Sequence, residues 1–249
     1  MDLESKVALV TGGSGDLGAA IAKALARAGA DVAVSYVGER GRAEQTAAAV
    51  EALGRRAWVV QLDQADPEAA EAVIAATVKQ FGRLDVLVNN AAWNIGIPFT
   101  DLDALTPDIW DRVYATNIRG PFLLARAAAR PMRAQKSGRI VNIASVGGIY
   151  PAASSIAYAT SKAALIHLTR CLAVALAPDV LVNCVAPGLI EGTRMAQRLP
   201  SAIVESVRRQ VLLGRSATPD DLADQVVAFC RSDSVTGQVL PIDGGLFPR

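Results

Sequence analysis

The sequence has few of the residues that hold metal-bound or disulfide-linked domains together. It contains three cysteines, Cys171, Cys184 and Cys230, and a single histidine, His167. An odd number of widely spaced cysteines does not suggest a disulfide framework, so we expect reduced thiols within the core. A lone histidine with no cysteine or second histidine nearby gives no ligand pattern, and we predict no metal site.

An excess of either sign of charge is also absent. The 25 basic and 24 acidic residues give a formal net charge of +1, and the basic residues are scattered along the chain. We therefore expect no nucleic-acid partner.

The chain also offers little that would place it in or across a membrane. Residues 140–161 carry no charge, but they include glycine, proline, serine and asparagine, so we expect a buried strand and a loop and no membrane partner. The first four residues lack the basic and then apolar order of a signal peptide, and we expect a cytoplasmic protein.

What the chain does have is a regular alternation of two patterns along 249 residues. Short apolar runs that fit buried strands lie at residues 6–11, 31–36, 57–62, 84–89, 139–143, 180–186 and 238–242. Helical stretches alternate with them near residues 17–28, 41–53, 67–81, 107–133, 155–177, 201–212 and 219–231. This order predicts an α/β fold with a doubly wound, seven-stranded parallel sheet and helices on both faces. No linker divides the chain, so we expect one domain.

Three predicted helices begin with the same kind of pair, which is a capping residue followed by a proline. Asp66-Pro67, Thr106-Pro107 and Thr218-Pro219 each place a capping side chain before a proline at the first helical position. We interpret these residues as architecture.

A cluster of glycines follows the first predicted strand. Gly12, Gly13, Gly15 and Gly18 stand between that strand and an apolar-striped helix. A turn of this kind presents free backbone N–H groups and a helix dipole to an anion, which favours a phosphate-binding site. The alternative is a tight turn that binds nothing.

Four polar residues suggest acid–base chemistry. Tyr158 and Lys162 are four residues apart, which places both on one face of a helix. A neighbouring ammonium would lower the pKa of the phenol, and the Ser145 hydroxyl could hold a carbonyl oxygen while Tyr158 transfers a proton. Alone, Tyr-x-x-x-Lys is a weak signal, because a surface tyrosine beside a solvated lysine gives the same pattern.

Several of these motifs together resemble the short-chain dehydrogenases/reductases, in particular 3-oxoacyl-carrier-protein reductase-like members. Thr11 to Gly18 looks like the T-G-x-x-x-G-x-G turn, Asn89 to Ala92 is similar to N-N-A-G, and Asn117, Ser145, Tyr158 and Lys162 match the catalytic tetrad in order and spacing. The resemblance implies a Rossmann fold over residues 1–249 and hydride transfer between a nicotinamide cofactor and a carbonyl or alcohol, in the ketoreductase direction. It also implies that Lys162 bonds the nicotinamide ribose, that Asn117 positions a water, and that the chain forms a homotetramer or homodimer.

The resemblance and the loop positions together give a set of candidate site residues. The expected cofactor-binding residues are Gly12, Ser14, Gly15, Asp16, Leu17, Gly18, Tyr36, Arg40, Asp63, Asn90, Ala91, Tyr158, Lys162, Pro187, Gly188, Ile190 and Thr193. The expected substrate pocket consists of Trp93, Ile149, Tyr150, Leu189 and Met195, and residues 189–214 are expected to form a lid. Asp63 has an alternative role, which is to cap a turn.

Cofactor choice is expected to depend on the end of the second strand. An acid there would favour NAD(H), whereas residues 35–38 offer none and Arg40 and Arg42 follow, so we expect NADP(H) to be favoured over NAD(H). Asp16 stands where the family has its second glycine, and its carboxylate could weaken the binding of a pyrophosphate or could instead turn outward at the helix N-terminus.

Two other kinds of protein stay open on the sequence alone. A decayed glycine loop would suit a non-catalytic nucleotide-binding sensor or scaffold, against which the complete tetrad argues. A methyltransferase on a nucleotide-binding fold would leave Tyr158 and Lys162 unexplained.

Overall fold

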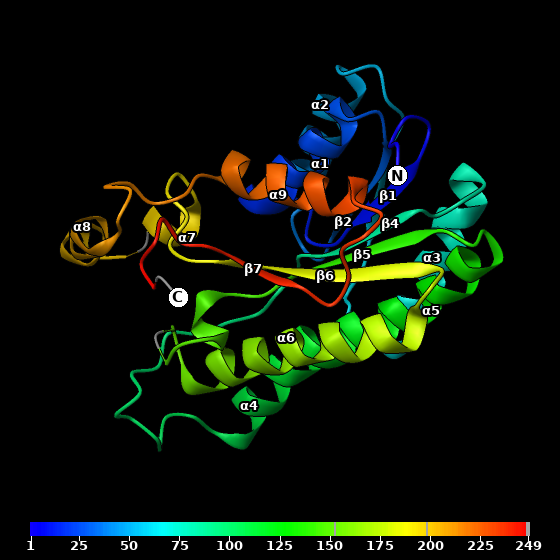
Figure 1. Cartoon of the computed structure of the whole chain (residues 1–249). Helices are drawn as coiled ribbons and strands as arrows, with labels where there is room; N and C mark the ends of the chain where they lie inside the picture. The colour runs from blue at the N-terminus through cyan, green and yellow to red at the C-terminus, as the bar shows by residue number, and fades with distance from the viewer. Residues whose placement is uncertain (152, 198, 248–249) are drawn as a thin grey trace.

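A seven-stranded parallel sheet forms the centre of the computed structural model, which describes residues 1–151, 153–197 and 199–247 (Figure 1). The strands lie in the order β3-β2-β1-β4-β5-β6-β7, and every neighbouring pair is parallel. Their bounds are β1 Val7–Val10, β2 Asp31–Tyr36, β3 Ala57–Gln61, β4 Val86–Asn89, β5 Gly138–Ile143, β6 Val180–Pro187 and β7 Val239–Ile242. The predicted doubly wound α/β fold with a seven-stranded parallel sheet is confirmed.

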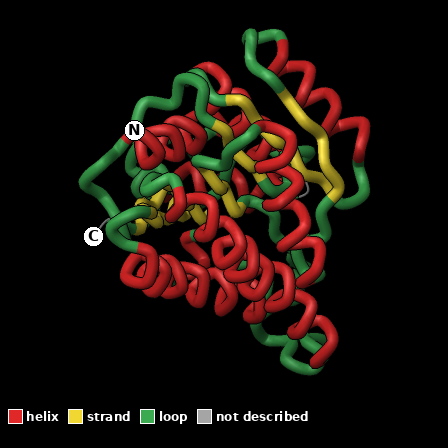
Figure 2. Tube along the Cα trace, turned by 90° about the vertical axis from the view of Figure 1, so that its right-hand side faces the viewer, coloured by secondary structure: helices red, strands yellow, loops and turns green. Residues whose placement is uncertain are grey.

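Helices cover both faces of the sheet (Figures 1 and 2). The helices α1, α2 and α9 pack on one face, and α3, α5 and α6 pack on the other. The longer helices are α1 Asp16–Arg27, α2 Arg40–Glu51, α3 Pro67–Phe81, α5 Gly120–Ala134, α6 Ile156–Leu176, α8 Ser201–Gln210 and α9 Pro219–Arg231. Central strands such as β1, β2 and β4 are buried along their whole length, which explains their nearly continuous apolar sequence.

The three predicted helix caps are all formed. The Asp66 carboxylate accepts a hydrogen bond from the Glu68 amide, and the Thr106 hydroxyl accepts one from the Ile109 amide. At α9, Thr218 and Asp221 cap each other reciprocally. Each side chain satisfies an amide that the first helical turn leaves without a partner.

One long helix predicted over residues 107–133 is divided in the structure. The helix α4, Pro107–Tyr114, passes through a π-helical segment, Ala115–Arg119, before α5 begins. At that junction Gly120 lies so close to the loop after β3 that an added Cβ would be 2.6 Å from the Gln64 carbonyl oxygen. The wider turn carries Asn117, and such segments occur often at functional sites.

The expectation for the cysteines was wrong at one position. Cys184 and Cys230 are buried free thiols, but Cys171 is exposed, because it lies on the solvent side of α6. Among the described helices, α6 alone has the length and apolar composition to cross a membrane, and half of that stretch is buried against the rest of the protein. A buried core helix passes the same test, so its composition is weak evidence for a membrane span.

The carboxyl ends of the strands meet at one edge of the sheet, near the short helix α7, Arg194–Gln197, which was not predicted. This edge is at the left of Figure 1, where α7, α8 and the C-terminus also lie. In an open parallel sheet this is the edge at which ligands bind.

Candidate functional site

The glycine turn lies between β1 and α1 and is packed too closely to admit side chains. Gly12 has a φ of +63°, which favours glycine. A Cβ on Gly18 would lie 2.3 Å from the Gly12 carbonyl oxygen and 2.9 Å from Asn90 Nδ2. The glycines therefore allow the first turn of α1 to approach the loop after β4.

The beginning of α1 fits an anionic group. Its first three amides, those of Asp16, Leu17 and Gly18, have no partner within the helix, because an α-helix leaves its first amides free. The preceding residue, Gly15, offers no side chain to cap them. Free amides and the positive end of the helix dipole are what a nucleotide phosphate requires.

Thr11 joins the turn to the loop after β4. It was expected only as the first residue of the glycine-turn motif, and its contacts with that loop were not predicted. Its hydroxyl accepts hydrogen bonds from the amides of Asn90 at 3.0 Å and Ala91 at 2.9 Å. The Asn90 side chain in turn donates to the Thr11 carbonyl at 2.8 Å. The predicted cofactor residues Gly12, Asn90 and Ala91 are therefore close together.

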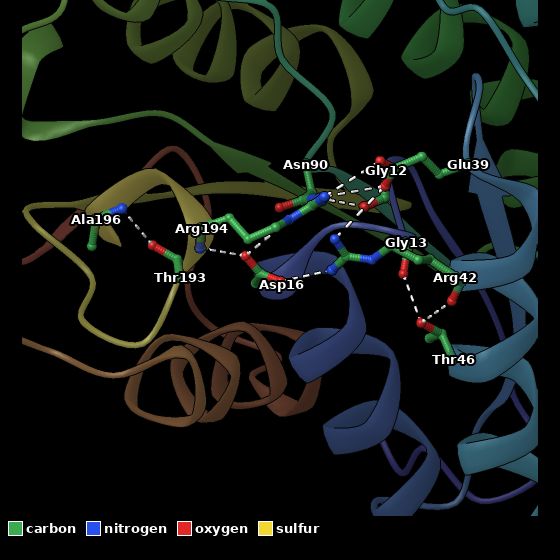
Figure 3. A network of polar contacts seen from close by, with 10 residues as sticks. All are labelled: Gly12, Gly13, Asp16, Glu39, Arg42, Thr46, Asn90, Thr193, Arg194 and Ala196. Carbon is green, nitrogen blue, oxygen red and sulfur yellow. Dashed lines mark hydrogen bonds and ion pairs between the residues drawn. The ribbon is translucent and has the colours of Figure 1, made fainter. Parts of the chain in front are cut away.

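The Asp16 side chain does not point along the helix as a cap. One oxygen accepts a 2.7 Å hydrogen bond from the Arg42 guanidinium, and the other accepts a 2.7 Å hydrogen bond from the Arg194 amide (Figure 3). Partial burial raises the pKa of Asp16, but these two partners outweigh it, so the pKa lies below its ordinary value. The carboxylate is thus ionised and paired with a cation.

The end of β2 holds the residues expected to select the cofactor. Tyr36 is buried, and Arg40 is exposed and forms an ion pair with Glu44 at 2.8 Å. A cleft of about 180 Å³ opens beside the glycine turn. Its polar lining residues are Ser14, Lys23, Arg42, Gln45 and Thr46. Lys23, which is half-buried on α1, was not predicted, because a lysine on a helix gives no distinguishing signal in the sequence.

Asp63 and Gln64 follow β3 and meet different surroundings. The exposed Asp63 carboxylate accepts a 2.9 Å hydrogen bond from the Ala65 amide, which is the turn-capping alternative. Gln64 is buried and donates to the carbonyls of Ala91 at 2.9 Å and Thr116 at 2.8 Å. Gln64, which the sequence did not single out, therefore ties the cofactor side of the site to the π-helical segment.

Ser145, Tyr158 and Lys162 come together from two different elements. Ser145 follows β5, its hydroxyl accepts from the Gly147 amide at 3.1 Å, and its side chain lies near enough to Tyr158 to lower the pKa of that phenol in part. Tyr158 and Lys162 lie one turn apart on α6, with Lys162 Nζ 5.5 Å from the centre of the tyrosine ring. The Lys162 ammonium donates a 2.7 Å hydrogen bond to the Ile143 carbonyl.

Burial, not the lysine charge, has the larger effect on the tyrosine in this structure. It raises the pKa of Tyr158 to about 12, although the hydrogen bond with Ser145 lowers it in part. Burial likewise lowers the pKa of Lys162 to about 8, with a smaller opposing influence of Cys184. The expected lowering of the phenol pKa by Lys162 is not found, because the ammonium is directed to the Ile143 carbonyl.

Asn117 is buried and its side chain is held by protein groups. Its carbonyl oxygen accepts from the Trp93 amide at 2.8 Å, and its amide nitrogen donates to the Trp93 carbonyl at 3.0 Å and to the Ser161 hydroxyl at 3.1 Å. Both N–H bonds are therefore used, and one lone pair on its oxygen stays open to another donor. Ser161 was not predicted as a partner.

The segment after β6 contains the last predicted cofactor residues. Pro187 ends β6 and its carbonyl accepts from Ser145 Oγ at 3.4 Å, while the Gly188 amide donates to the Ile242 carbonyl at 2.9 Å. Ile190 and Thr193 are both buried, and the Thr193 hydroxyl donates to the Ile190 carbonyl. Residues 189–214 thus begin beside Ser145; residue 198 lies outside the described residues.

The predicted substrate-pocket residues lie on several loops and differ in exposure. Trp93, Ile149, Tyr150 and Leu189 are half-buried, but the Met195 side chain is 58% exposed. Two aromatic contacts extend this region: Arg112 lies 4.3 Å from the centre of the Trp93 ring, and Phe247 stacks on Tyr150 at 3.9 Å. Arg112 and Phe247 were not predicted, since neither is close in sequence to a motif.

Comparisons with known proteins agree on one family. Residues 14–247 match the family model described as Enoyl-(Acyl carrier protein) reductase. The 3-oxoacyl-acyl-carrier-protein reductase FabG of Staphylococcus aureus is 38% identical over 248 residues, covering 98% of each chain.

Solved structures are similar over the same length. A short-chain dehydrogenase from Burkholderia cenocepacia J2315 in complex with NADP is 38% identical, with a TM-score of 0.89 and 99% of each chain covered. An NAD⁺-bound xylitol dehydrogenase is 31% identical, with a TM-score of 0.92, and covers 98% of this chain and 100% of that one. Matches of this length support the fold and the oxidoreductase activity, and nothing in them favours the non-catalytic alternative. The chain therefore belongs to the short-chain dehydrogenase/reductase family, and it is an NAD(P)-dependent oxidoreductase that interconverts a carbonyl and an alcohol of a small molecule.

Proposed function

We propose that this enzyme acts as a ketoreductase, with Tyr158 as the group that protonates the carbonyl oxygen. The observation that supports this most directly is the meeting of Ser145, Tyr158 and Lys162 at the carboxyl edge of the sheet, where Lys162 Nζ lies 5.5 Å from the centre of the Tyr158 ring and donates to the Ile143 carbonyl. The bound nicotinamide supplies the hydride to the carbonyl carbon. Tyr158, protonated at neutral pH, gives its proton to the oxygen as the negative charge develops there.

Ser145 and Lys162 support that proton transfer in different ways. The Ser145 hydroxyl holds the carbonyl oxygen beside Tyr158, and its own position is fixed by the Gly147 amide. The Lys162 ammonium stabilises the phenolate that remains after the transfer, because it lies on the same helix face one turn away. The family resemblance adds a contact from Lys162 to the nicotinamide ribose.

Asn117 contributes by hydrogen bonding both the amide and the carbonyl of Trp93. Because its two N–H bonds are used within the protein, the open lone pair on Asn117 and the Trp93 carbonyl are the groups that could hold a proton-relaying water. The π-helical segment places Asn117 for this contact.

We propose NADP(H) as the favoured cofactor. The glycine turn, Asn90, Ala91, Pro187, Gly188, Ile190 and Thr193 are the residues that would hold it, and Tyr36 and Asp63 border its adenosine end. The end of β2 provides no acid for a ribose 2′-hydroxyl, whereas Arg40 and Arg42 are the nearby cations. Arg42 borders the cleft beside Ser14 and is the better placed of the two, and a 2′-phosphate there would share its guanidinium with Asp16, which accepts from it at 2.7 Å.

The proposed substrate is a ketone with an apolar or aromatic portion. Trp93, Ile149, Tyr150 and Leu189 are half-buried residues on loops that follow the carboxyl ends of the strands. The Staphylococcus aureus relative is named for a 3-oxoacyl thioester, so such a thioester belongs among the first compounds to test. Residues 189–214 would close over the substrate.

We also propose that the enzyme forms a homotetramer or homodimer through α5 and α6 and that it is cytoplasmic. Val174 on α6 is 84% exposed and Phe122 on α5 is 42% exposed, which suits helices that pair with a second copy.

Replacing the tyrosine tests the proposed chemistry. In Tyr158→Phe the ring stays and the proton donor is lost, so turnover of NADPH with a ketone substrate should fall by on the order of a thousandfold. Tyr114→Phe is a matched control, because Tyr114 lies on α4 and stacks on Trp110. Near-normal turnover in Tyr158→Phe would remove this residue from the chemistry.

A further inference from the structure

Asp16 connects three segments that are far apart in the sequence. It begins α1, and its carboxylate reaches Arg42 at the start of α2 and the amide of Arg194 at the start of α7 (Figure 3). Only the last of these belongs to the segment expected to form the lid. A glycine at position 16, as in the family pattern, would have no side chain to make either contact.

The contact with Arg194 reaches the backbone of the lid and not only a mobile side chain. Thr193 is buried, donates its hydroxyl to the Ile190 carbonyl and accepts from the Ala196 amide at 3.2 Å. This fixes the first turn of α7, and the Arg194 amide then donates to Asp16 at 2.7 Å. A hydrogen bond to a carboxylate is stronger than one to a neutral acceptor.

Arg42, the other partner of Asp16, is also held in place by hydrogen bonds on α2. The Thr46 hydroxyl donates to the carbonyls of Gly13 and Arg42, which joins α2 to the glycine turn. Arg42 is thereby held beside Asp16, where its guanidinium donates at 2.7 Å.

A second acid completes a ring of alternating charges. Glu39 lies 3.7 Å from the Arg42 guanidinium and 3.3 Å from that of Arg194, and Arg194 Nε is 3.7 Å from Asp16. Two acids and two arginines therefore face one another with no excess charge. Asp16 and Arg42 are its less exposed members, at 25% and 30%, so the ring is centred on the glycine turn.

We infer that Asp16 is a positioning residue that fastens the lid to the cofactor turn. The inference rests on the proposed function, in which the glycine turn holds the cofactor and residues 189–214 close over the substrate. The Asp16 carboxylate, at a position where the family has glycine, then places Thr193 and the start of α7 against the nucleotide site. The charge of Asp16 is balanced by Arg42, and its second oxygen accepts from the Arg194 amide of the lid.

Hydrogen exchange in the cofactor-free protein tests the inference without any reaction. In Asp16→Gly, amides of peptides covering residues 190–197 should exchange faster by on the order of tenfold, because the acceptor of the Arg194 amide is lost. Asp16→Asn keeps an acceptor oxygen and loses the ion pair, so its increase should be smaller. Glu71→Gln is the control, since it removes an exposed ion pair with Arg126 on another part of the protein and should leave these peptides unchanged.

The outcomes separate this inference from the proposed function. Faster exchange in Asp16→Asn and Asp16→Gly, with Glu71→Gln unchanged, supports it even if no ketone is reduced. Unchanged exchange in both Asp16 variants overturns it even if the wild type is an active reductase. If Asp16→Gly does not fold, the comparison of Asp16→Asn with Glu71→Gln decides alone. In an active enzyme, losing the contact between Asp16 and the Arg194 amide should raise KM more than it lowers kcat. A general loss of stability would not change the two parameters in this way.

Discussion

At the scale of single residues, the pKa of Tyr158 differs from the simple expectation. A cation one helical turn away was expected to make Tyr158 acidic, yet burial raises its pKa to about 12 and the Lys162 ammonium is directed to the Ile143 carbonyl. In the reductive direction this is no disadvantage, because the phenol must carry its proton before the hydride arrives. Lys162 then acts mainly on the phenolate that forms.

The pKa values predict how activity depends on pH. The pKa of Lys162 is about 8, below the ordinary 10.5, so the charge that stabilises the phenolate is lost as pH rises through about 8, while Tyr158 keeps its proton to about 12. The kcat/KM for the reduced cofactor, which reports the free enzyme, should therefore fall above about pH 8. A value that stays constant from about pH 7 to 10 would contradict this role of the lysine.

At the scale of secondary-structure elements, the helix starts were the easiest features to predict and the interruptions the hardest. A capping side chain before a proline acts locally, so Asp66, Thr106 and Thr218 were recognisable in the sequence and are formed. The π-helical segment ends where Gly120 packs against Gln64 in the loop after β3, and no local pattern in the sequence indicates this interruption.

A cap deletion provides the test at this scale. Thr218→Ala removes the reciprocal cap of α9 and should lower the free energy of unfolding by about 1 kcal/mol. For a chain of this size that corresponds to a decrease in Tm of about 3 °C. Thr100→Ala, in an exposed loop, is the matched control and should leave the Tm unchanged. Equal melting temperatures for both variants and the wild type would show that the capping box does not stabilise α9.

At the scale of the whole molecule, the sequence predicted the sheet and the meeting of the site residues but not their contacts. The parallel sheet brings Gly12, Asn89, Ser145 and Pro187 to one edge, and this was expected because each was predicted at the carboxyl end of a strand. The partners of Asp16 could not be predicted, since Arg194 is 178 residues away and its amide carries no sequence signal. The same holds for Phe247 on Tyr150. Long-range pairs depend on the final packing, whereas motifs depend on local geometry.

In a working reductase, the glycine turn that contains Asp16 must bind the phosphates of a nicotinamide cofactor. The most direct measurement is a fluorescence titration of the purified protein with NADPH and, separately, with NADH. NADPH is expected to bind in the micromolar range and more tightly than NADH, because residues 35–38 at the end of β2 provide no acid for a ribose 2′-hydroxyl and Arg40 and Arg42 lie just beyond. Binding of neither cofactor at concentrations up to about 1 mM, which corresponds to about −4 kcal/mol, would contradict this expectation.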